Sequence, residues 1–183
     1  MLVCKIKNVA DFESEKNYRT ACDCFYYSED TALALSQVEK ILKLAPEHDR
    51  AWFLRGEIFL LENNIEEAIQ SFEKFEEHVR KDGKKNTNRA RNFANIAVCF
   101  EMLDDHQNAL LYCDKALELI SDEDWDFLPS LYRLQISALI KLKKYSKAKK
   151  ALRELNSFLF SEDVHYLKTH LDNSIKLKPI SQA

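Results

Sequence analysis

Glycine and proline are scarce in this chain: among its 183 residues only two are glycine and three are proline. Tight hairpin turns and phosphate-binding loops depend on glycine, so its scarcity disfavours sheet-rich folds and nucleotide-binding loops. The motifs G-x-x-x-x-G-K-[ST], G-x-S-x-G and H-E-x-x-H are also missing. These absences favour long helices joined by short connections, and they predict a protein that is not an enzyme and holds no cofactor.

Strong charge bias and long apolar runs are missing as well. The formal net charge is −3, whereas proteins that bind nucleic acid are usually basic. No apolar stretch is long enough for a signal peptide or a membrane span, so we expect no membrane partner. The cysteines are odd in number and scattered, which is typical of reduced thiols. We therefore predict a cytoplasmic protein, and the oligomeric state stays open.

Four segments of the chain share one pattern of residues. Each opens with an aromatic residue, has a large apolar residue seven positions later and an alanine sixteen positions later. In three segments a small residue stands four positions after the opening aromatic, and Ile136 replaces it in the fourth. The opening aromatics are Tyr18, Trp52, Phe93 and Tyr132, the small residues are Cys22, Gly56 and Ala97, and the alanines are Ala34, Ala68, Ala109 and Ala148.

The anchor alanines are separated by 34, 41 and 39 residues, and 34 residues is the tetratricopeptide period. With Trp52, Gly56, Phe59, Ala68 and Phe72 all on pattern, the second segment is the most specific, and the chain resembles the tetratricopeptide repeat (TPR) family. The resemblance implies an all-α, right-handed superhelical solenoid of about four helix-turn-helix repeats. We expect a single domain over 1–183, with repeats at 15–46, 49–82, 90–122 and 129–160 and a C-terminal capping helix at 161–176.

Local signals place the helices within this frame. The apolar periodicity predicts helix pairs at 14–28 and 31–44, 47–62 and 65–80, 89–103 and 105–120, and 129–142 and 145–160. Asn64-x-x-Glu67 and Asp104-x-x-Gln107 indicate capping boxes at the start of two second helices. Asn63 is predicted to take the left-handed conformation that ends a helix. Val164, Leu167, Leu171 and Ile175 form the apolar stripe of the predicted capping helix.

The resemblance also implies that the first helix of each repeat lines a concave groove. An arginine lies near the start of every first helix, followed by apolar residues that form a strip, with two acidic residues one turn behind. We predict that this groove binds a protein or peptide carrying apolar and acidic residues. Two alternatives stay open: the strip is covered by the chain's own terminus, or it packs between helices. The candidate residues are Arg19, Asp23, Arg50, Phe53, Leu54, Glu57, Arg91, Asn95, Val98, Arg133 and Leu134, with Ala94 also in the strip.

Chaperone adaptors of the same family grip a C-terminal carboxylate with basic residues and two asparagines. Only Arg19 and Asn95 match that set, whereas Asp23 and Leu54 stand where asparagines are needed. We therefore do not expect this carboxylate clamp.

An alternative function rests on the basic segment 141–153, which holds seven basic residues and no acidic one. Such a face can contact nucleic-acid phosphates. Without interleaved stacking aromatics we favour a solvated outer face of the fourth repeat. We interpret Cys22, Cys24, Cys99 and Cys113 as buried, free packing residues. We expect no metal site among the histidines.

Overall fold

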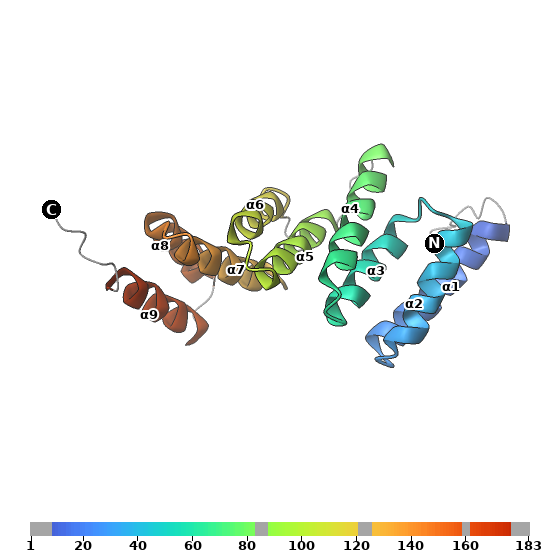
Figure 1. Cartoon of the computed structure of the whole chain (residues 1–183), viewed down its shortest axis with the longest axis horizontal. Coiled ribbons are helices and arrows are strands. Elements are labelled where there is room, and N and C mark those ends of the chain that lie inside the picture. The colour runs from blue at the N-terminus through green and yellow to red at the C-terminus, as the bar shows by residue number, and fades with distance from the viewer. Residues whose placement is uncertain (1–8, 83–87, 121–125, 159–161, 177–183) are drawn as a thin grey trace. The chain divides into compact units, whose positions relative to one another are not determined.

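The structure is a computed structural model that describes residues 9–82, 88–120, 126–158 and 162–176. The described residues form nine α-helices and no strand. Their bounds are α1 Val9–Tyr26, α2 Thr31–Leu44, α3 Asp49–Leu61, α4 Ile65–Asp82, α5 Asn88–Met102, α6 His106–Leu117, α7 Leu128–Lys141, α8 Tyr145–Phe158 and α9 Glu162–Lys176 (Figure 1). The predicted all-α fold and its helix pairs are confirmed, although α1 begins earlier than expected and α6 ends earlier.

The helices fall into two compact units. Unit 1 holds α1–α4, and unit 2 holds α5–α9. In each unit successive helices pack as pairs, α1 on α2 and α3 on α4 in unit 1, α5 on α6 and α7 on α8 in unit 2 (Figure 1). The first helices also contact one another, α1 with α3 and α5 with α7. The single domain over 1–183 stays a prediction.

Helix α9 completes unit 2. It packs on α8 and α7, with Leu167 and Leu171 buried in the core of the unit and Ile175 packed against that core. The other residue of the predicted stripe, Val164, lies outside the residues whose side chains the structure describes. A terminal helix that buries one apolar face is what a repeat array needs at its end.

Each first helix turns into its partner through a left-handed residue. Glu29, Asn63, Asp104 and Lys143 have φ between 54° and 61°, and each lies eleven residues after the opening aromatic of its repeat. The next residue donates its N–H back to the first helix, from Asn64 to Phe59, Asp105 to Phe100 and Lys144 to Leu139, at 2.8–2.9 Å. These bonds satisfy carbonyls that a helix end leaves unpaired.

The left-handed conformation of Asn63 was predicted, but the capping box at Asp104 was placed one residue too early. Asp104 is the left-handed residue, and Asp105 is the N-cap of α6, whose side chain accepts from the N–H of Asn108 at 3.1 Å. Both positions hold aspartate, so the pattern alone did not separate the residue that ends one helix from the residue that opens the next.

Small residues lie where paired helices cross. The four anchor alanines, Ala34, Ala68, Ala109 and Ala148, are fully buried. Unit 1 fills the space between them with Val38, Ile41, Leu54 and Ile58, and unit 2 with Ile136, Leu139, Leu155 and Leu171. The repeat pattern therefore reports core packing, and it fixes which faces of the first helices are left for other contacts.

Candidate functional site

The arginine near the start of α3 is held by α1. Arg50 donates a hydrogen bond from Nη2 to Oε2 of Glu15 at 2.6 Å, and its guanidinium lies 4.6 Å from the centre of the Tyr18 ring. Burial by itself would raise the pKa of Glu15, but the hydrogen bond and charge of Arg50 outweigh it and hold that pKa below its ordinary value. Arg19 also approaches Glu15, at 3.6 Å. Glu15 therefore pairs with Arg50 and lies near Arg19, the two arginines that the row has in unit 1.

The arginine of α5 is held in a similar way by the start of α7. Arg91 bonds through Nη2 to Oδ2 of Asp126 at 2.5 Å, and its guanidinium lies 4.7 Å from the Phe127 ring centre. The hydrogen bond from Arg91 keeps the pKa of the Asp126 carboxyl below its usual range. Arg133 of α7 is exposed and donates a hydrogen bond to the hydroxyl oxygen of Ser130 at 3.1 Å.

The predicted apolar strip is corrected for unit 1. Phe53 and Leu54 were expected to be exposed, yet their exposed fractions are 6 % and 1 %. Phe53 packs against the rings of Phe72 and Phe75 in α4, and Leu54 belongs to the core that α1, α2 and α3 share. The alternative that the strip packs between helices is therefore right for these two residues. Ala94 is also buried.

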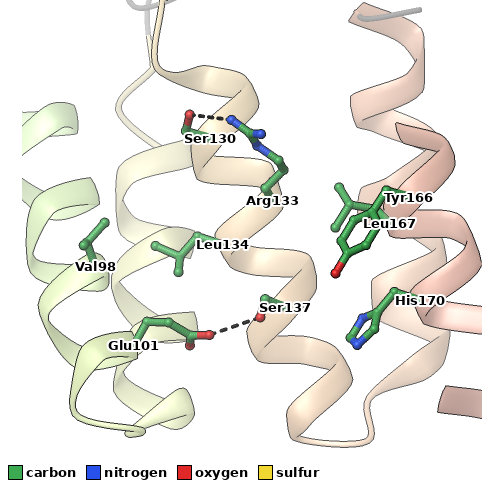
Figure 2. A pocket seen from close by; sticks show the side chains of 9 residues that line it. All are labelled: Val98, Glu101, Ser130, Arg133, Leu134, Ser137, Tyr166, Leu167 and His170. Carbon is green, nitrogen blue, oxygen red and sulfur yellow. Dashed lines mark hydrogen bonds between the residues drawn. The ribbon is translucent and has the colours of Figure 1, made fainter. Parts of the chain in front are cut away.

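A groove lies across the first helices of unit 2. Its volume is about 530 Å³, and α5, α7 and α9 each contribute residues to it (Figure 2). Val98 and Leu134 line it together with Leu167, while Arg133 stands beside them on α7. The lining residues are Val98, Glu101, Ser130, Arg133, Leu134, Ser137, Tyr166, Leu167 and His170. Three of the residues from α5 and α7, namely Val98, Arg133 and Leu134, belong to the set predicted from the sequence.

Glu101 fixes the polar end of this groove. Its Oε1 accepts a hydrogen bond from the Ser137 hydroxyl at 3.1 Å, and its Oε2 lies 2.9 Å from Nδ1 of His106 (Figure 2 draws the Ser137 bond). The carboxylate stands between the serine and the histidine. A nucleophilic serine would instead need the histidine beside it to take its proton. This arrangement positions the Glu101 carboxylate between Ser137 and His106.

Two groove residues from α9 were missed by sequence reasoning. Tyr166 and His170 are four residues apart, and their rings stack with centres 6.2 Å apart. The spacing places them on one face of α9, which the sequence already showed. Because α9 was interpreted only as a cap, its second face was not assigned.

The other candidate residues do not line this groove. In unit 1, Asp23 is exposed, and Glu57 accepts a hydrogen bond from the Tyr26 hydroxyl at 2.5 Å, which links α3 to α1. In unit 2, Asn95 is half-buried on α5. The structure therefore brings together Val98, Arg133 and Leu134 from the predicted set.

The cysteines and the basic segment are placed largely as expected. Cys24, Cys99 and Cys113 are buried and free, whereas Cys22 is free but only half-buried. Burial raises the pKa of Cys99 and of Cys113 to about 12. The basic residues of segment 141–153 are exposed. Among the described residues no cluster of histidine, cysteine and acidic side chains could hold a metal ion, and no described helix is long and apolar enough to cross a membrane.

Comparisons with known proteins agree with this architecture. A family model described as "Tetratricopeptide repeat" matches residues 24–82, and one described as "Domain of unknown function (DUF6340)" matches residues 55–157. A search of curated proteins finds no match.

Solved structures share the fold at low sequence identity. PilF of Pseudomonas aeruginosa superposes with a TM-score of 0.69 at 17 % identity, over 91 % of this chain and 69 % of that one. YrrB, described as a TPR protein with an unusual peptide-binding site, superposes with a TM-score of 0.70 at 16 % sequence identity, over 95 % of this chain and 94 % of that one. The N-terminal domain of stress-induced protein-1 from C. elegans superposes with a TM-score of 0.60 at 16 % sequence identity, over 70 % of this chain and 99 % of that one.

The recurring helix pairs, their left-handed turns and the buried alanines define a helical repeat protein. The resemblance to the tetratricopeptide repeat family is confirmed by the family model that matches residues 24–82 and by the shared fold of the solved structures. The model that matches residues 55–157 covers more than half of the chain, so the chain belongs to the family described as a domain of unknown function, DUF6340.

Proposed function

We propose that this chain is a non-enzymatic protein-interaction module that binds a segment of a partner protein in the groove between α5, α7 and α9. One observation carries the proposal: the groove combines apolar side chains with an exposed arginine on its wall. Exposed apolar surface in a concavity is typical of binding sites. An adaptor, a scaffold or an assembly chaperone would use such a module.

The groove fits a segment that carries both apolar and acidic side chains. Val98, Leu134 and Leu167 offer a surface for an aliphatic or aromatic side chain of the partner. Arg133 would orient a carboxylate beside it, because arginine binds carboxylates with a planar pair of donors. Glu101 already bonds to Ser137 and His106, so its negative charge is partly compensated within the chain.

Support also comes from YrrB, which shares the fold and is described as a TPR protein with an unusual peptide-binding site. The comparisons give no support to the alternative of nucleic-acid binding through segment 141–153. We place the protein in the cytoplasm, a proposal supported by the free thiols of Cys24, Cys99 and Cys113.

The test is an affinity capture with wild type and two matched variants, followed by mass spectrometry. Val98→Lys puts a charge into the groove, whereas Leu111→Lys makes the same change at an exposed apolar residue of α6. We expect partners captured by wild type and by Leu111→Lys to be lost with Val98→Lys. If Val98→Lys captures the same partners as wild type, the groove is not the binding site.

Binding kinetics with a captured partner test the charge complementarity. Arg133→Glu is expected to lower the association rate and its dependence on salt, because a like charge now repels an acidic segment. Lys147→Glu makes the same charge change on α8, outside the groove. Equal effects of the two variants would mean that the partner responds to overall charge and not to the groove.

A further inference from the structure

A second cleft lies between α8 and α9 of unit 2, on residues that the groove does not use. Its volume is about 480 Å³. The buried side chains of Leu152 and Leu171 form its apolar part, with exposed fractions of 9 % and 1 %. Three exposed cations stand around them, Lys149 and Arg153 from α8 and Lys168 from α9. Asn156 and Asp172 complete the lining.

Positive charge dominates this cleft and the helix beside it. Asp172 is the single acidic residue among those that line it, against three cations. Segment 141–153 adds Lys143, Lys144 and Lys147 to the same region of the sequence. Within the described part of the chain, the one ion pair formed by this segment joins Lys150 to Glu154 at 3.6 Å. Like charges held close together repel, and an anionic partner would relieve that repulsion.

We propose that the α8–α9 cleft is a second docking site, separate from the groove, for an acidic segment of a partner protein. An apolar side chain of that segment would pack against Leu152, while its carboxylates would meet Lys149, Arg153 and Lys168. The amide of Asn156 can both donate and accept hydrogen bonds, so it suits a peptide backbone. The proposal accounts for a cleft that combines three exposed cations with an apolar floor.

The lining of the cleft favours an acidic protein segment over a nucleic acid. Single-stranded nucleic acids bind where aromatic side chains stack on the bases, and none of the residues that line this cleft is aromatic. Asp172 would repel a phosphate backbone. A peptide can place a donor against Asp172 and its carboxylates against the three cations.

The experiment measures fluorescence anisotropy of the full chain with a labelled acidic peptide built from glutamate and leucine. Two further probes are a glutamate–serine peptide of the same charge and a single-stranded oligonucleotide. The cleft variant is Lys149→Glu/Arg153→Glu/Lys168→Glu. The matched control, Lys143→Glu/Lys144→Glu/Lys147→Glu, makes the same charge change outside the cleft. Circular dichroism melts verify that both variants fold.

We expect the cleft variant to weaken binding of the glutamate–leucine peptide at least about tenfold, because three attractive charge pairs become repulsive. The control variant should change the affinity by less than about threefold. The glutamate–serine peptide should bind more weakly to wild type. Equal losses in both variants would overturn the proposal, because binding would then follow net charge alone. So would the absence of peptide binding, or oligonucleotide binding that is tighter and lost in the cleft variant.

Discussion

Gly56 of α3 faces the ring of Phe72 in α4 so closely that a Cβ atom at position 56 would lie 2.6 Å from Cδ1 of that ring. Real Cβ atoms do not approach a neighbour to that distance, so the ring or a helix would have to move. Phe72 is fully buried and touches Phe53, which leaves little room for the ring to yield. The glycine is therefore a packing requirement of the second repeat.

Gly56→Ala is expected to lower the free energy of unfolding by up to about 2 kcal/mol. Overpacking a core usually costs about 1–3 kcal/mol, and the gain that alanine brings to a helix interior, about 1 kcal/mol, offsets part of that cost. Urea denaturation followed by circular dichroism gives the value. In a Phe72→Leu background the same change should cost less, because the smaller side chain can make room. An equal cost in both backgrounds would show that the Phe72 ring is not what limits position 56.

Lys143→Gly is expected to raise the free energy of unfolding by about 1 kcal/mol. Lys143 has φ 57°, a conformation that costs a residue with a side chain about 1–2 kcal/mol and costs glycine little. Lys147→Gly, within α8 and without a positive φ, serves as the control and should give no gain. Thermal melts of the two variants compare them directly, and equal shifts would argue against strain at position 143.

His48→Asn is expected to reduce the loss of stability in mild acid. His48 caps α3 by accepting the N–H of Ala51 on Nδ1 at 3.1 Å, which requires the neutral ring. Burial, aided by the charge of Arg50, holds the pKa of His48 below its ordinary 6.5. The stabilising contribution of the neutral ring is therefore fully present above about pH 6.5 and is lost as the pH falls through the lower folded-state pKa.

Asparagine can cap the helix at every pH, so the variant should match wild type at about pH 7.5 within about 0.5 kcal/mol and exceed it at about pH 5. Urea denaturation at the two pH values provides the measurement. His165→Asn changes an exposed histidine of α9 and should leave the pH profile as it is in wild type. A His48→Asn profile parallel to that of wild type would contradict the role of the His48 cap.

Leu171→Ala is expected to lower the free energy of unfolding by about 2–5 kcal/mol, because it removes a side chain that is 1 % exposed from the core of unit 2. Urea denaturation measures this loss.

Deleting α9 should have the larger consequence of exposing Leu152 and Leu155 on α8 and promoting self-association. Light scattering of the truncated protein tests this. A monomeric truncated chain with an unchanged melting temperature would contradict the capping role.

Thiol labelling should separate the cysteines by burial. In a Cys4→Ser background at about pH 8, a thiol reagent is expected to modify half-buried Cys22 first and to reach Cys99 and Cys113 only after unfolding. Burial raises the pKa of both inner thiols to about 12, so they carry almost no thiolate at that pH. Mass spectrometry of digested samples at several times gives the order, and rapid labelling of native Cys99 would contradict it.

The fold was predictable because the residues that recur in the repeat pattern are the ones that pack in the core. The alanines at helix crossings, Gly56 against Phe72 and the left-handed Asn63 each follow from local chemistry that a single sequence shows. The position of the α6 cap was less certain, because Asp104 and Asp105 both suit it and only the backbone decides between them.

The candidate site was predictable only in part. An inward register position does not say whether neighbouring helices already cover it, and Phe53 and Leu54 are covered by α4 and by the α1–α2 pair. Likewise, a row of arginines does not reveal that Glu15 and Asp126 already hold two of its members, because those pairs join residues 35 positions apart. The sequence pattern predicts which residues face inward on each helix. Which of them are buried by a neighbouring helix, and which arginines are paired with a carboxylate, depends on tertiary contacts.

The turn at the end of each first helix makes the repeats interchangeable at that point. Glutamate, asparagine, aspartate and lysine all occupy the left-handed position, so the main chain takes the same conformation there with four different side chains. Exchange of whole helices between repeats is therefore limited by their buried faces and not by the joint between them. A chimera that joins the first helix of one repeat to the second helix of another should therefore keep its left-handed turn, and its stability should depend on how well the two buried faces fit.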